Sequence, residues 1–350
     1  MIASLGQLID AMGVECQIFD MGRRIQEISK TTFQQFEHQD IPYPSPYTQK
    51  AWLGISFWPA DTPEALTLWF IQLPLDEQGK LLQAERDRFL QQLLVGAGKN
   101  LQAAKQGNQF EEVLKGNPYI FTPTPEKQAS INAKIRQKLN LGHSQYFDAA
   151  IHYLQSDLNN WQELPLQGLA DVACHWRELQ AQLIQAIPEL PAQPLISLCQ
   201  LLESEPLNSE VSAALYQRLT GLLADTGSVK DDSVKSQIIA LVRGLSHATD
   251  MELKQEALRQ CLNSPIASDT ELLSTIASRC HMDLFEPRIC QIFLENLAQQ
   301  PPTVFNALLK DLLFIPALRP YLLDNLNRHP SPAVKSAFDQ FTTLIRKNMH

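Results

Sequence analysis

The sequence contains no apolar run that approaches the roughly 20 residues a transmembrane helix needs. Its first residues also lack the basic start of a secretory signal peptide, and Asp10 interrupts their apolar stretch. Because both features are missing, we expect neither a membrane protein nor a secreted protein. The sequence predicts a protein of the cytoplasm.

Cysteine is scarce, and its spacing shows no ligand pattern. The six cysteines are scattered over 350 residues, and no C-x-x-C pair occurs. Cysteine and histidine come together at Cys174-His175 and Cys280-His281, but neither place offers the four closely paired ligands of a structural zinc site. We therefore expect reduced cysteines that pack as small apolar residues, with no metal site and no cofactor.

Positive charge is in deficit. The chain has 29 Lys and Arg residues against 38 Asp and Glu residues, a net charge of -9. This balance provides no overall attraction for nucleic acid, so the composition argues against a nucleic-acid partner. The best candidate for a local basic groove is a helix with Lys127, Lys134, Arg136 and Lys138. We interpret these side chains as the solvated face of an amphipathic helix.

The motifs of common enzyme classes are missing as well. The sequence has no G-x-S-x-G, no H-E-x-x-H and no glycine-rich dinucleotide fingerprint. It therefore predicts no catalytic residue, and it favours a protein that is not an enzyme without deciding the question.

The chain has the composition of a folded protein. Charged residues make up 19% and hydrophobic residues 44% of it, and it has 14 glycines, so neither the disordered nor the collagen-like class fits. A length of 350 residues favours two domains. We place the boundary between 1–123 and 124–350. A loop is predicted at Gly116-Asn117-Pro118, and a helix follows it with Thr124 as its cap and Pro125 at its first position.

The N-terminal region, 1–123, is predicted to be a small α+β domain. Residues 51–58 and 65–73 are rich in β-branched and aromatic residues, and the turn chemistry between them predicts a β-hairpin. Apolar residues recur at helical spacing from Lys80 to about Ala104, which predicts a long helix that covers one face of the hairpin.

The C-terminal region, 124–350, is predicted to be entirely helical. Helical runs of about 12 to 17 residues alternate with short breaks, most of which contain proline, such as Ile187-Pro188 and Ile315-Pro316. Short breaks make neighbouring helices antiparallel, so we expect stacked helical hairpins, an irregular α-solenoid of the HEAT type. A compact helical bundle stays open as the alternative, because no strict repeat period is visible.

Several N-terminal residues could contact a ligand or a partner. Paired arginines after a strand can bind carboxylate or phosphate, aromatic residues can line an apolar cavity, and two adjacent carboxylates can add polar contacts. These candidates are Arg23, Arg24, Tyr43, Trp52, Trp58, Asp76 and Glu77. Each group also has a structural interpretation, namely ion pairs within the fold, a sheet core, and carboxylates at a helix N-terminus.

Four N-terminal stretches resemble a known family. They are Ile18-Phe19-Asp20-Met21-Gly22-Arg23-Arg24, Pro42-Tyr43-Pro44, Ala51-Trp52-Leu53-Gly54-Ile55-Ser56-Phe57-Trp58 and Leu73-Pro74-Leu75-Asp76-Glu77-Gln78-Gly79. In these stretches the chain resembles the domain of unknown function 3549 family of Gram-negative bacteria. The resemblance implies a bacterial cytoplasmic protein, and it brings no activity, substrate or catalytic residue.

Two hypotheses of function follow. In the first, the chain is a non-enzymatic scaffold or adaptor whose helical array presents a surface to a protein partner. In the second, it is a small-molecule binder or an enzyme with a pocket in the N-terminal region. The sequence leaves the identity of the partner, the ligand and the oligomeric state open.

Overall fold

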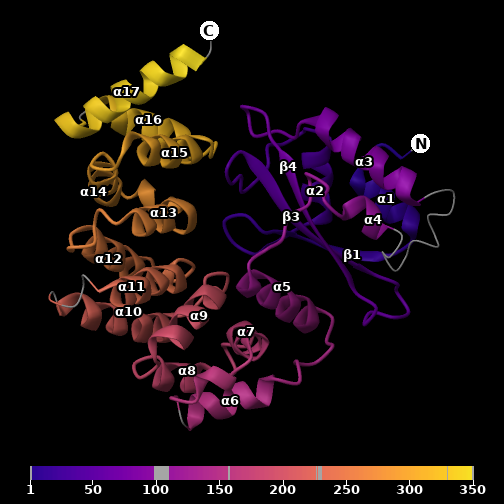
Figure 1. Cartoon of the computed structure of the whole chain (residues 1–350), viewed down its shortest axis with the longest axis horizontal. Coiled ribbons are helices and arrows are strands. Elements are labelled where there is room, and N and C mark those ends of the chain that lie inside the picture. The colour runs from indigo at the N-terminus through magenta and orange to yellow at the C-terminus, as the bar shows by residue number, and fades with distance from the viewer. Residues whose placement is uncertain are drawn as a thin grey trace. The chain divides into compact units, whose positions relative to one another are not determined.

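The computed structural model of the chain describes residues 2–97, 110–156, 158–225, 227, 231–328 and 330–348. It divides into two compact units, Met1–Gly142 and His143–His350 (Figure 1). The N-terminal unit combines helices with a small sheet, and the described part of the other unit is helical. The predicted fold class, mainly α with a small α+β N-terminal region, is confirmed.

The sheet of the N-terminal unit has four antiparallel strands in the order β2-β1-β3-β4. The strands are β1 (Glu15–Asp20), β2 (Gln26–Ile28), β3 (Lys50–Trp58) and β4 (Thr67–Pro74). Strands β3 and β4 form the predicted hairpin, with its bounds shifted by one or two residues. The edge of β4 is extended by a short segment, because the backbone N–H of Gln72 donates to the Tyr119 carbonyl oxygen at 2.7 Å.

Helices cover both faces of this sheet. They are α1 (Leu5–Met12), α2 (Lys30–Glu37), α3 (Gln83–Ala97), α4 (Glu111–Leu114) and α5 (Pro125–Lys138). Helix α5 packs Ile131 and Ile135 against Phe19, Met21 and Ile25 on one face. On the opposite face, α2 contacts β1 and α3 contacts β4. The predicted long helix corresponds to α3, and the part of that prediction from 98 to 104 lies outside the described residues.

The close approach of α5 to the sheet depends on a glycine. Gly54 lies in the middle of β3, and a Cβ atom built on it would lie 2.8 Å from the Cδ1 atom of Ile131 and 3.1 Å from the Cγ atom of Met21. Any larger residue would therefore push the helix or these side chains away.

The division of the chain differs from the predicted boundary between residues 123 and 124. Thr124 does cap α5, and Pro125 does begin it. Helix α5 nevertheless belongs to the N-terminal unit, because Ile131 and Ile135 complete the core on one face of its sheet. The Thr-Pro pattern marks the start of a helix, and it carries no information about which unit the helix joins.

The C-terminal unit is a stack of helical hairpins. Its elements are α6 (Phe147–Gln155), η3 (Trp161–Glu163), α7 (Leu166–Cys174), α8 (Gln180–Ala186), α9 (Ala192–Leu202), α10 (Ser209–Ala224), α11 (Asp232–Leu245), α12 (Met251–Leu262), α13 (Thr270–Arg279), η5 (His281–Phe285), α14 (Pro287–Leu297), α15 (Pro302–Leu313), α16 (Arg319–Arg328) and α17 (Pro332–Asn348). Several helices, such as α8, are shorter than the predicted 12 to 17 residues.

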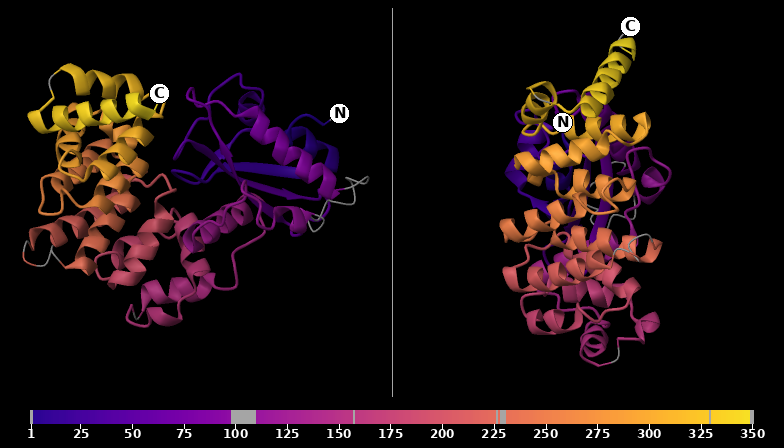
Figure 2. Two further views of the ribbon diagram at one scale, coloured as in Figure 1. Left: turned by 45° about the horizontal axis from the view of Figure 1, so that its top comes forward. Right: turned by 90° about the vertical axis from the view of Figure 1, so that its left-hand side faces the viewer.

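The contacts between helices show two layers. One layer runs through α7, α9, α11, α13 and α15, and the other through α6, α8, α10, α12 and α14, with each helix touching the one two places further along the chain. Figure 2 shows these helices one above another. The predicted stack of helical hairpins is confirmed, and its likeness to HEAT repeats stays a prediction.

Helix starts in the stack use two kinds of signal. Pro287 and Pro302 begin α14 and α15, as the proline breaks predict. Helices α11, α12 and α13 instead follow Asp231, Asp250 and Asp269, whose carboxylates accept the first free backbone N–H groups. None of the helices among the described residues is both long and apolar enough to cross a bilayer.

Candidate functional site

The predicted contact residues are spread over the N-terminal unit. Arg23 is buried, its Nε atom donates to the Pro46 carbonyl oxygen at 2.8 Å, and its guanidinium carbon lies 5.4 Å from the ring centre of Tyr47. Arg24 beside it is half-buried. The contacts of Arg23 hold the loop before β3 in place, and they occupy the side chain within the fold.

The tryptophans do not gather around one cavity. The Nε1 atom of Trp52 donates to the Tyr47 carbonyl oxygen at 2.8 Å, and its ring meets the edge of Phe121 with the ring centres 4.8 Å apart. Trp58 is buried at the far end of the same strand. Trp52 and Trp58 are six positions apart, which is about 20 Å along an extended chain.

The two carboxylates have different roles. One oxygen of Asp76 accepts the backbone N–H groups of Gln78 and Lys80, both at 2.8 Å, and so closes a tight turn at Gly79. This turn precedes α3 by several residues, so Asp76 shapes a loop and does not cap the helix. Glu77 is exposed in that turn.

The buried polar group that sequence reasoning missed is Asp20, the last residue of β1. Only 3% of it is exposed. The hydroxyl of Tyr43, one of the predicted residues, donates to the Oδ1 atom of Asp20 at 2.6 Å, and the backbone N–H of Gly22 donates to the same atom at 3.4 Å. A signal was present, because alternation along the strand places Asp20 on the same side as the buried Ile18.

Burial controls the ionisation of this pair. It raises the pKa of Asp20 from 3.8 to about 6, although the hydrogen bonds from Tyr43 and Gly22 and the charges of Lys127 and Arg23 oppose the change. Burial and the neighbouring carboxylate raise the pKa of Tyr43 well above its usual value of 10. At neutral pH, Tyr43 is therefore a hydrogen-bond donor and Asp20 is mostly an acceptor.

A cavity of about 210 Å³ opens beside the pair. It is lined by Asp20, Gln26, Glu27, Ile28, Ser29, Thr32, Tyr43, Pro44 and Ser45. Asp20, Ile28 and Tyr43 are buried at its floor, whereas Glu27 and Ser29 are among the exposed residues of its rim. The cavity is therefore a small solvent-accessible pocket with a carboxylate at its base.

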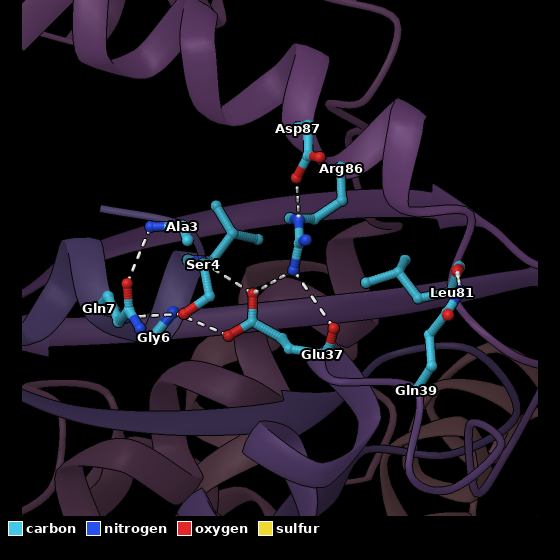
Figure 3. A network of polar contacts seen from close by, with 10 residues as sticks. Ala3, Ser4, Gly6, Gln7, Glu37, Gln39, Leu81, Arg86 and Asp87 are labelled. Atoms are coloured by element: carbon cyan, nitrogen blue, oxygen red, sulfur yellow. Dashed lines mark hydrogen bonds and ion pairs between the residues drawn. The ribbon is translucent and has the colours of Figure 1, made fainter. Parts of the chain in front are cut away.

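A second buried carboxylate, Glu37, has a structural role (Figure 3). Its Oε1 atom accepts the backbone N–H of Leu5 at 2.7 Å, its Oε2 atom accepts that of Gly6 at 2.9 Å, and the Arg86 guanidinium lies 3.9 Å away. Burial raises the pKa of Glu37, and these contacts lower it. The network joins α1, α2 and α3, and its groups are occupied by one another.

The cysteine thiols have little nucleophilic character. Burial raises the pKa of Cys199 and of Cys261 to about 12, and it also raises the pKa of the half-buried Cys16. These thiols are protonated at neutral pH, so they are poor nucleophiles. Within the part of the chain that the structure describes, no three His, Cys, Asp or Glu side chains are grouped so that they could hold a metal ion.

Two ion-pair groups lie along one edge of the helical stack. The Glu203 carboxylate at the end of α9 lies 2.7 Å from Arg243 of α11 and 3.1 Å from Arg279 of α13. The Lys254 ammonium of α12 lies 3.1 Å from the buried carboxylate of Asp283 in η5. These ion pairs connect successive hairpins at the turns that join the two layers of helices.

Comparison with known proteins gives one match. The model of a family described as "Protein of unknown function (DUF3549)" matches residues 1–342, nearly the whole chain. No curated protein and no solved structure matches the chain.

Proposed function

Since this chain belongs to the DUF3549 family of proteins of unknown function, we propose a role from its own structure: the chain is a cytoplasmic, non-enzymatic scaffold. The helical stack of its C-terminal unit binds a protein partner. The observation that carries this proposal is a pair of exposed methionines, one where α12 begins after α11 and one in the turn between α13 and α14.

Met251 begins α12 and is 48% exposed, and Met282 in η5 is 54% exposed. The ion pair between Lys254 and Asp283 joins their turns, because Lys254 lies one helical turn after Met251 and Asp283 follows Met282. Both methionines therefore lie on the same edge of the stack. We call this pair, Met251 and Met282, the methionine edge.

The methionine edge suits protein binding for a chemical reason. Methionine is unbranched and polarisable, so it adapts to apolar surfaces of different shapes. Burial of such side chains in an interface contributes about 25 cal/mol per Å² of apolar surface. The partner we expect offers an apolar segment, because a fully polar surface would gain nothing from the two thioethers.

The turns behind these methionines are held in place before any partner arrives. Glu203 with Arg243 and Arg279 fixes the ends of α9, α11 and α13, and these ion pairs are largely shielded from solvent. A surface that is ordered in advance loses less conformational entropy on binding. The ion pairs therefore favour a rigid docking edge.

The test is affinity capture with the full chain from a lysate of its source organism, with captured proteins identified by mass spectrometry. The variant M251E/M282E places charge on the methionine edge. A matched control is V95E, because Val95 is an apolar residue of the other unit that is 82% exposed. Circular dichroism checks that each variant is folded.

We expect one reproducible protein partner with the parent chain and with V95E, and at least a tenfold lower yield with M251E/M282E. If no partner is captured, or if the double variant captures the same protein equally well, the proposal is wrong.

A further inference from the structure

The outer edge of the sheet, at β2, has the features of a peptide-binding site that the scaffold role does not use. We propose that β2 binds an extended, acidic segment of another protein, which pairs with it as an added strand. The site lies within the N-terminal unit, so it stands or falls independently of the methionine edge.

One residue of β2 presents its backbone to the outside of the sheet. The structure describes no strand beyond β2. The backbone N–H of Met21 donates to the Trp52 carbonyl oxygen at 2.7 Å, so odd-numbered residues of β1 bond to β3 and even-numbered residues bond to β2. Gln26 and Ile28 therefore pair with β1, whereas the N–H and carbonyl groups of Glu27 point away from it. Neither group has a hydrogen-bond partner in the described chain.

A cavity lies on each face of the sheet at this edge. The cavity of about 210 Å³ is on the face that carries α2, where Gln26 and Ile28 line it. The other cavity, of about 430 Å³, is on the face that carries α5. Its lining consists of Phe19, Ile25, Glu27, Lys134, Gln137 and Lys138. Successive side chains of a strand point to opposite faces, so those of an added strand would enter the two cavities in turn.

The two cavities favour different side chains. Ile28 and Pro44 give the cavity on the α2 face apolar walls, which suit a β-branched apolar side chain. The cavity on the α5 face is lined by two lysines, Lys134 and Lys138, and by one carboxylate, Glu27, which lies 3.0 Å from Lys138. The net charge of this lining is positive, so it favours a second carboxylate. The expected segment therefore alternates apolar and acidic residues.

A second copy of the chain suits this edge less well. Two β2 strands paired antiparallel about Glu27 would place the two Glu27 side chains opposite each other on one face. Both α5 helices would lie on that face, and Lys134 and Lys138 of the two copies would approach one another. Like charges directly opposite are destabilising, so we assign the edge to a different protein.

The probe is a fluorescein-labelled hexapeptide of alternating valine and glutamate, titrated with the full chain and followed by fluorescence anisotropy. A pairing through so few hydrogen bonds would be lost in the washes of a capture experiment. Two further peptides carry N-methyl groups, one on its valines and the other on its glutamates. Consecutive N–H groups of a strand point to opposite edges, so only one of the two loses the N–H groups that face β2. That peptide should bind about tenfold more weakly than the unmethylated one, and the other should bind equally well.

Variants of the chain locate the site. E27P removes the outward N–H of β2, which an edge strand tolerates, and it should weaken binding about tenfold. E27Q keeps this N–H, and it should bind at least as well as the parent chain. K138E should lower the preference for the glutamate peptide over one of alternating valine and lysine. K115E, at an exposed lysine of the same unit, should leave that preference unchanged.

Circular dichroism checks that each variant is folded, and the N-methylated peptides test the pairing with the parent chain alone. No saturable binding of the unmethylated peptide, equal binding of the two N-methylated peptides, or unchanged binding by folded E27P would each overturn the proposal. A dimer of the parent chain that E27P converts to a monomer would also overturn it, because the edge would then belong to a second copy.

Discussion

The buried carboxyl group of Asp20 links the stability of the N-terminal unit to pH. The pKa of Asp20 is about 6 in the folded chain, whereas an unperturbed aspartate, as in the unfolded chain, has a pKa of 3.8. Between these values the unfolded chain releases the proton and the folded chain keeps it. The contribution of Asp20 to stability is therefore lost as the pH rises from about 4 to about 6, by on the order of 2 to 3 kcal/mol.

We predict that D20N removes this pH dependence. Asn keeps an oxygen that accepts the Tyr43 hydroxyl, and it has no proton to release. Urea denaturation at pH 4 and at pH 7 should show D20N gaining stability relative to the parent chain as the pH rises. The explanation fails if the difference in the free energy of unfolding between D20N and the parent chain is the same at both pH values.

The Glu37–Arg86 pair gives a second prediction at this scale. Both side chains are buried, and R86A would leave the Glu37 carboxylate without its cation. We expect a loss of about 3–5 kcal/mol in the free energy of unfolding. R88A removes an exposed arginine that pairs with Glu85, and it should cost no more than about 1 kcal/mol in the same measurement. Equal effects would contradict this account.

At the scale of elements, the contact between α5 and the sheet is the most sensitive one. We predict that G54A destabilises the chain by about 1–3 kcal/mol, since the new methyl group would overlap Ile131 and Met21. Gly221 in α10 provides the control, because no atom lies within 4 Å of the position of its Cβ atom.

G221A should therefore stabilise the chain by about 0.5–1 kcal/mol, as an exposed helical glycine replaced by alanine does. Thermal unfolding followed by circular dichroism measures both variants. If G54A and G221A change the stability of the chain in the same direction, packing around the new methyl group does not explain the difference expected between the two sites.

The elements were predictable where their signal is local. The hairpin of β3 and β4 was visible in its β-branched and aromatic residues, and the start of α5 was visible in Thr124 and Pro125. The partner of α5 was not visible, because the fit of Ile131 over Gly54 is a contact between residues that are distant in the sequence.

The same limit applies to the candidate site. Tyr43 was selected for its aromatic ring, but its role follows from a hydrogen bond to Asp20, which lies 23 residues away. Trp52 and Trp58 were selected for the same reason, and their positions on one strand keep them apart. Residue type indicates which chemistry is available, whereas the fold decides which side chains meet.

At the scale of the whole molecule, the division at residue 142 predicts how fragments behave. A fragment of residues 1–142 retains α5 on the sheet, whereas a fragment of residues 1–123 exposes Phe19, Met21 and Ile25. We expect cooperative thermal unfolding for the longer fragment, and aggregation or a broad transition for the shorter one. Equal unfolding transitions would place the boundary at residue 123 instead.

The central claim is that the helical stack binds a protein partner at the methionine edge. Hydrogen–deuterium exchange of the full chain, with and without its captured partner, tests it most directly. The claim predicts slower exchange at the turns around Met251 and Met282, and no change in residues 1–142. Protection confined to residues 1–142 would contradict it.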